Sequence, residues 1–318
     1  MAQPESFHKQ VQAARSLTHD ILERINTVIV GKSQPVRLAL ACLLARGHLL
    51  IEDVPGVGKT MLAHTLAKVL GLSFSRIQFT SDMLPADVIG VSVFNNREQR
   101  FEFHPGPLFS SVVLADEINR ATPKAQSALL EAMEERQVSA EGKTYPLPDP
   151  FYVIATQNPN DQIGTFPLPE SQLDRFLMRI RMGYPDPESE RELFKGDDRR
   201  LLLQQTEAVV GPSHLRQIQR VCGHVHVSEA LLDYVQALVN ATRGVGWLRY
   251  GLSPRAGMAW IRAARVWAFL SGRDLVLPED VQAIGPPILS HRLQGTEHAG
   301  VDAGEELAAR LLRGVPIP

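Results

Sequence analysis

The feature that most constrains the fold of this chain is an apolar run, His48-Leu49-Leu50-Ile51, that leads into a glycine-containing loop and then a helix-like segment. The loop, EDVPGVGKT at residues 52–60, ends in Gly58-Lys59-Thr60, and the segment MLAHTLAKVL follows it. A strand that turns through such a loop into a helix is typical of a phosphate-binding site in an α/β fold. The pattern therefore predicts a strand, a phosphate loop and a helix in that order.

The residue types in this loop suit the chemistry of phosphate binding. Gly56 and Gly58 let backbone N–H groups approach phosphate oxygens, and Lys59 is expected to contact the β and γ phosphates. The hydroxyl of Thr60 is expected to bind Mg²⁺, and the following helix adds the positive end of its dipole. The general loop has glycine where this chain has Asp53, so the segment alone could also be an ordinary turn.

A second apolar run, Val112 to Ala115, ends in two carboxylates, Asp116 and Glu117. A short continuous apolar run is expected of a parallel strand covered on both faces. Beside a phosphate loop, the two acids supply a metal partner and a base that orients water, which phosphoryl transfer needs. We assign Asp116 to Mg²⁺, through water, and Glu117 to the attacking water. The two motifs together predict ATP binding and hydrolysis.

Composition limits what else the chain can be. Of its 318 residues 44% are hydrophobic, and no uninterrupted apolar stretch reaches the ~18 residues of a membrane span. Only Cys42 and Cys222 occur, and the start, MAQPESFHKQ, does not have the pattern of an export signal. We therefore predict about two globular domains in a reducing cytoplasm, without membrane insertion. The net charge of −2 argues against a nucleic-acid partner.

Apolar runs and helical segments alternate through the first part of the chain. This alternation predicts an α/β fold with a parallel sheet between helices, with strands at 48–53, 73–79, 111–116, 151–156 and 177–182. Tyr184-Pro185-Asp186-Pro187 stops regular structure, and the pattern after it is helical. We therefore predict a nucleotide-binding domain at 1–184 and a smaller all-α domain at 185–318.

Two segments interrupt the alternation, VSVFNNREQRFEF and QVSAEGKTYPL, and both have the pattern of β-hairpins that project from the sheet. In the first, the two valines should share one face and pair with Phe101 and Phe103. Surface decoration remains an alternative role for both hairpins.

A helix in the second part begins at Ser253-Pro254-Arg255. An arginine in the first turn opposes the helix dipole unless an anion lies nearby, and a γ-phosphate would be such an anion. Simple surface placement of Arg255 is the alternative.

Five segments resemble the MoxR-type AAA+ ATPases, and the resemblance covers nearly all of the chain. The most specific segment is LADEINRATPKAQSALLEAMEERQV, which EDVPGVGKT, IATQNP, LPESQLDRF and LSPRAGMAW support. Asp53 in the phosphate loop is normal in this family. The resemblance implies an αβα nucleotide-binding domain followed by a helical lid, assembled into a homo-oligomeric ring, usually hexameric, with ATP between subunits.

The resemblance also implies the roles of individual residues. Asn158 resembles the first sensor, Arg175 the finger that reaches a neighbour's γ-phosphate, and Arg255 the second sensor. Asn158 could instead only form a loop ahead of Pro159, and Arg175 could form a surface ion pair with Asp174. The predicted catalytic residues are Glu117, Lys59, Asn158, Arg175 and Arg255, and the predicted metal residues are Thr60 and Asp116. The predicted nucleotide-binding residues are Val30, Gly31, Pro55, Gly56, Val57, Gly58, Lys59, Thr60 and Met61. Arg120 has no role that the sequence indicates.

These roles describe an ATP-driven remodelling or assembly factor that acts on a protein client. Relatives typically work with proteins that carry a von Willebrand factor A domain, often to mature a complex or insert a metal, and the hairpins resemble inserts near the ring pore. A nucleic-acid motor and the ATPase subunit of a metal chelatase remain alternatives, because both share the same core.

Overall fold

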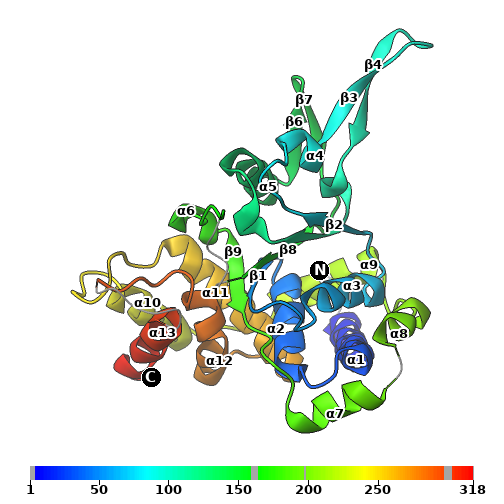
Figure 1. Cartoon of the computed structure of the whole chain (residues 1–318). Coiled ribbons are helices and arrows are strands. Elements are labelled where there is room, and N and C mark those ends of the chain that lie inside the picture. The colour runs from blue at the N-terminus through cyan, green and yellow to red at the C-terminus, as the bar shows by residue number, and fades with distance from the viewer. Residues whose placement is uncertain (1–3, 159–163, 197, 297–302, 318) are drawn as a thin grey trace.

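A computed structural model describes residues 4–158, 164–196, 198–296 and 303–317. Its centre is a sheet of parallel strands in the order β2-β5-β8-β1-β9 (Figure 1). The strands are β1 (His48–Glu52), β2 (Phe74–Gln78), β5 (Val112–Asp116), β8 (Tyr152–Gln157) and β9 (Phe176–Ile180). The predicted parallel sheet is confirmed, and each strand begins within one residue of the position expected from the sequence.

Alternate side chains of the strands enter two hydrophobic cores, as the two-residue period of a strand requires. Leu49 and Ile51 of β1 face one core, and Leu50 faces the other. The first core is lined by α1 (Pro4–Val28), α2 (Ser33–Leu44) and α3 (Lys59–Val69), and the second by α4 (Pro85–Ile89) and α5 (Pro123–Glu135). The short helical turns are α6 (Glu170–Leu173), η1 (Pro107–Phe109) and η2 (Ile118–Arg120).

Two hairpins project from the sheet side by side (Figure 1). They are β3 (Gly90–Asn95) with β4 (Arg100–Pro105), and β6 (Gln137–Ala140) with β7 (Lys143–Pro146). The pairing expected in the first hairpin is wrong, because Val91 lies opposite His104 and Val93 opposite Glu102. Phe101 lies opposite Phe94 instead. The turn that joins Asn95 to Arg100 sets this register, which places the valines and the two β4 phenylalanines on opposite faces.

The rest of the chain is helical. Ser228 and Ser253 cap two of its helices by accepting hydrogen bonds from backbone N–H groups, as expected of N-cap serines. The core under α1 and α2 continues into α9 and α11, so the sheet and the helical part share buried contacts. The helices are α7 (Pro187–Lys195), α8 (Arg199–Gln205), α9 (Pro212–Gly223), α10 (Glu229–Ala241), α11 (Pro254–Leu270), α12 (Pro278–Leu289) and α13 (Ala303–Gly314).

The proposed division between residues 1–184 and 185–318 falls in the connection from β9 to α7. Within the described ranges, none of the helices combines the length and the apolar character that crossing a membrane requires.

Candidate functional site

A cavity of about 580 Å³ opens where β1, β5 and β8 end at their carboxyl edge. Open parallel sheets bind ligands at this edge. Helix α8 also lines the cavity, through Arg200, Leu203 and Gln204. The predicted site residues that line the cavity are Pro55, Gly56, Gly58, Lys59, Thr60, Met61, Asp116, Glu117 and Asn158.

The phosphate loop has the backbone that close approach to a ligand requires. Gly56 and Gly58 have φ angles of 87° and 96°, in the left-handed region that favours glycine. Because α3 begins at Lys59, its first residues line the cavity. Lys59 Nζ donates to the carbonyl oxygens of Asp53 at 2.6 Å and Val54 at 3.2 Å. Burial lowers the pKa of Lys59, and nearby carboxylates oppose that shift.

Asp116 is held on both of its carboxylate oxygens. Thr156, a buried residue of β8, donates from its hydroxyl to Asp116 Oδ1 at 2.5 Å. Arg76 of β2 places its Nη2 2.6 Å from Asp116 Oδ2. The hydroxyl of Thr156 also accepts from the backbone N–H of Glu117 at 2.9 Å. One threonine therefore fixes the relative position of the two acids.

Glu117 has a backbone conformation that is uncommon for a residue with a side chain. Its φ is 57°, and it precedes the turn η2. Such left-handed residues are enriched at functional sites, where the surrounding structure maintains them. Arg120 Nε lies 3.1 Å from Glu117 Oε2, so the arginine without a predicted role contacts the predicted base. Both side chains are partly exposed, and the pair contributes little to stability.

Three predicted nucleotide-binding residues lie outside this cavity. Val57 packs against the core under α1 and α2. Val30 and Gly31 line a separate cavity of about 600 Å³. Helix α8 contributes to both cavities, through Leu203 to the first and Leu202 to the second. The two cavities are thus neighbours that share a helix.

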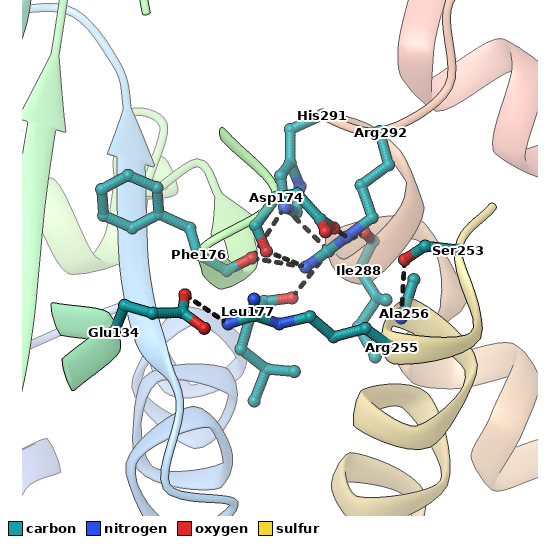
Figure 2. Close-up of polar contacts among 10 residues, drawn as sticks. All are labelled: Glu134, Asp174, Phe176, Leu177, Ser253, Arg255, Ala256, Ile288, His291 and Arg292. Carbon is teal, nitrogen blue, oxygen red and sulfur yellow. Dashed lines mark hydrogen bonds and ion pairs between the residues drawn. The ribbon is translucent and has the colours of Figure 1, made fainter. Parts of the chain in front are cut away.

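Arg175 and Arg255 also lie outside the first cavity, and both reach the carboxylate of Glu134 at the end of α5. Arg255 Nη2 lies 2.7 Å from Glu134 Oε2 (Figure 2), and Arg175 Nε lies 4.0 Å from the same oxygen. Arg175 additionally donates to the carbonyl of Leu130. The hydrogen bond from Arg255 is the main cause that lowers the pKa of Glu134. The anion beside the first turn of α11 is therefore Glu134.

Asp174 pairs with Arg292 instead of its neighbour Arg175. Arg292 Nε lies 2.7 Å from Asp174 Oδ1, and the arginine side chain is 6% exposed (Figure 2). Its guanidinium also donates to the carbonyls of Phe176, Leu177 and Ile288. These contacts fasten the end of α12 to the start of β9, so they hold the helical part on the sheet.

Sequence reasoning missed several residues of the first cavity. Thr156 could have been found, because the two-residue period of a strand places it on the same side as Asn158. Arg76 could not, since its contact with Asp116 depends on which strand neighbours β5. Arg200 lies in SERELFKGDDRR, a segment whose mixed charges are typical of a solvated face. Helix α7 in that stretch has no buried residue, but Arg200 lines the cavity.

Two family models match the chain. Residues 48–178 match the ATPase family associated with various cellular activities (AAA), and residues 241–310 match the AAA lid domain. The first match contains the phosphate loop, the two acids, Asn158 and Arg175, and the second contains Arg255.

Several known proteins are similar over nearly the whole chain. Chaperone MoxR1 of Mycobacterium tuberculosis is 44% identical, over 92% of this chain and 80% of that protein. Protein MoxR of Methylorubrum extorquens is 35% identical, over 85% of both. A crystal structure from Cytophaga hutchinsonii, of a protein assigned provisionally as an ATPase, has a TM-score of 0.88 and 38% identity, over 99% of this chain and 98% of that one.

Proposed function

Because this chain belongs to the MoxR family of AAA ATPases, we propose that it hydrolyses ATP in the cavity beside β1 and uses this hydrolysis to remodel or assemble a protein client. The observation that carries the proposal is that Lys59, Thr60, Asp116 and Glu117 line one cavity, although they come from two separate motifs. A phosphate loop and paired acids at the end of a buried strand are the parts that ATP hydrolysis requires.

The side chains divide the work of phosphoryl transfer. Lys59 would bind the β and γ phosphates. Thr60 and Asp116 offer a hydroxyl and a carboxylate to the same cavity, which are the hard oxygen donors that Mg²⁺ takes. Bound Mg²⁺ would neutralise negative charge on the phosphates. Glu117 would orient the attacking water and accept its proton, and Asn158, just after β8, would help to hold that water.

Arg175 and Arg255 are proposed to act on the ATP of a neighbouring subunit in a ring, usually hexameric among relatives. Neither arginine lines the cavity of its own chain, and Glu134 holds both at one place on the surface. An arginine supplied by a neighbour can accelerate hydrolysis by ~10³ or more. Hydrolysis would then depend on assembly.

The projecting hairpins are the proposed contact with the client. Phe101 is 66% exposed and Val91 is 52% exposed, so apolar groups are presented to solvent on both faces of the longer hairpin. Phe103 stacks on Tyr145 of the other hairpin, with ring centroids 4.2 Å apart, so a movement of one hairpin would reach the other. We propose a cytoplasmic complex with a von Willebrand factor A domain protein, acting in complex maturation or metal insertion.

The test is ATP hydrolysis and affinity capture with two variants. Glu117→Gln should bind ATP and hydrolyse it slowly, and it should retain a partner with a von Willebrand factor A domain from native cytoplasm. Lys59→Ala should fail to load ATP and is the control. Unchanged hydrolysis by Glu117→Gln would refute the enzymatic assignment, and enrichment of nucleic acid or of a porphyrin-binding subunit would favour a motor or a chelatase instead.

A further inference from the structure

Asp53 occupies the position at which the general phosphate loop has glycine, and it is buried with 8% of its surface exposed. Its carboxylate accepts hydrogen bonds from backbone N–H groups on two different segments. Oδ1 accepts from Val54 at 2.8 Å, and Oδ2 accepts from Met182 at 2.7 Å and Gly183 at 2.6 Å. The phosphate loop is thereby bonded to the connection that leads from β9 into α7.

Gly183 is held through its carbonyl group as well as its N–H. Lys32, which is 6% exposed, donates from Nζ to the Gly183 carbonyl at 2.8 Å. Gly183 has a φ of 63°, a left-handed value that favours glycine at this turn. In the first turn of α7, a Cβ on Gly31 would lie 2.5 Å from the Cβ of Ser189, so these backbones approach closely. The connection is therefore held both by the phosphate loop, through Asp53, and by Lys32, which precedes α2.

Asp53 also contacts the lysine that binds phosphate. Lys59 Nζ donates to the backbone carbonyl of Asp53 at 2.6 Å, while the carboxylate of the same residue holds Met182 and Gly183. A change in the contacts of Lys59 therefore affects Asp53, whose side chain is hydrogen-bonded to the connection between β9 and α7.

We propose that Asp53 is a positioning residue that transmits the state of the phosphate site to the connection between the sheet and the lid. The inference rests on the proposed ATPase function. It also explains why this loop departs from the general pattern, since glycine at this position would permit phosphate binding but would not hold Met182 and Gly183. Lys32 holds the same residue, Gly183, so its loss should have an effect of the same kind.

The decisive variant is Asp53→Gly, because it restores the general loop and removes the side chain that holds Met182 and Gly183. ATP affinity is measured by calorimetry in a Glu117→Gln background, turnover by phosphate release, and the connection by hydrogen–deuterium exchange of residues 182–189. We expect the Kd for ATP to stay within ~3-fold while kcat falls ~10-fold or more. The reason is that the variant alters the connection between β9 and α7, which acts as a hinge, and leaves the phosphate site in place. The exchange response of residues 182–189 to ATP should disappear.

Three further variants separate coupling from folding. Asp53→Ala also removes both acceptor oxygens but keeps Cβ, and it gives the same test if Asp53→Gly does not fold. Lys32→Met should reproduce the loss of kcat at unchanged ATP affinity. Asp280→Asn is the control, because Asp280 is also a buried carboxylate that accepts from a backbone N–H, that of Leu277; it pairs with Arg273 as well, and it lies in α12. It should lower stability without changing kcat.

The outcomes distinguish this inference from the proposed function. If the unmodified protein does not hydrolyse ATP, the proposed function is wrong, and the exchange response to ATP binding alone still tests the coupling. If the unmodified protein hydrolyses ATP and Asp53→Gly does so at the same rate, the coupling role is refuted. A loss of ATP affinity as large as the loss of kcat would equally refute it, since Asp53 would then only shape the loop.

Discussion

Replacing Thr156 by valine tests whether hydrogen bonds, rather than packing, orient the two acids of the site. Thr156 is 1% exposed, and its hydroxyl donates to Asp116 and accepts from the backbone of Glu117. Valine has nearly the same shape but no hydroxyl. The variant therefore leaves one carboxylate oxygen and one N–H group without this partner, while the packing of β8 is retained.

The magnitude follows from these two hydrogen bonds. Leaving a buried polar group unsatisfied costs about 1–3 kcal/mol. Arg76 still pairs with the other oxygen of Asp116, so we expect a total loss of about 2–4 kcal/mol in the free energy of unfolding. Glu117 would also lose the contact that maintains its left-handed backbone. Since a misplacement of about 1 Å can cost ~10²-fold in rate, kcat should fall ~10- to 100-fold.

Urea unfolding and ATP turnover measure the two effects separately. The matched control is Thr65→Val, because Thr65 is fully buried and its hydroxyl donates only within α3, to the carbonyl of Met61. The control should reduce stability by less than about 1 kcal/mol and leave kcat unchanged. If Thr156→Val unfolds and hydrolyses ATP like the unmodified protein, the threonine does not orient the acids, and packing alone must do so.

Three more predictions concern other parts of the chain. Burial lowers the pKa of His48 from 6.5 to about 4. The free energy of unfolding should therefore be highest above pH 6.5 and fall as the pH drops towards 4, because the unfolded state binds the proton more readily. Over that pH range the urea midpoint should decrease less in His48→Gln than in the unmodified protein. Arg292→Met should lower the free energy of unfolding by about 1.5–3 kcal/mol in thermal unfolding, because the carbonyls of Phe176 and Leu177 lose a buried charged donor and the partly exposed Asp174 loses its partner. Arg175→Ala should be inactive alone but regain hydrolysis when mixed with Lys59→Ala, because each supplies what the other lacks.

Local patterns were sufficient to predict the sheet and most of the first cavity. In β5 the residues before Asp116 are all buried, with Val113 facing one core and Leu114 the other, so a continuous apolar run is the pattern expected of this strand. The glycines of the loop are likewise recognisable, because their backbone angles exclude most other residues. These features depend on residues adjacent in the sequence.

Features that depend on distant partners could not be predicted in the same way. Alternation assigned Val91 to a face of its strand, but the number of residues in the turn decided that Phe101 would lie on the other face. The position of Arg255 in the first turn of α11 indicated an anion, but dipole electrostatics is the same for a phosphate and for a carboxylate. Only the fold shows that this anion is Glu134, which lies far from Arg255 in the sequence.

The ion pair between Arg255 and Glu134 has a consequence for ring assembly. If Arg255 acts on a neighbour's phosphate, it must leave Glu134, so ATP in the neighbouring cavity has to compete with a carboxylate of the same chain. Glu134→Gln removes this competing charge but keeps the side-chain volume, and it should lower the ATP concentration at which the ring assembles, measured by sedimentation velocity. Glu131→Gln, on the same helix, is the control. If Glu134→Gln needs as much ATP as the unmodified protein, Arg255 does not exchange between the two anions, and its role lies within its own chain.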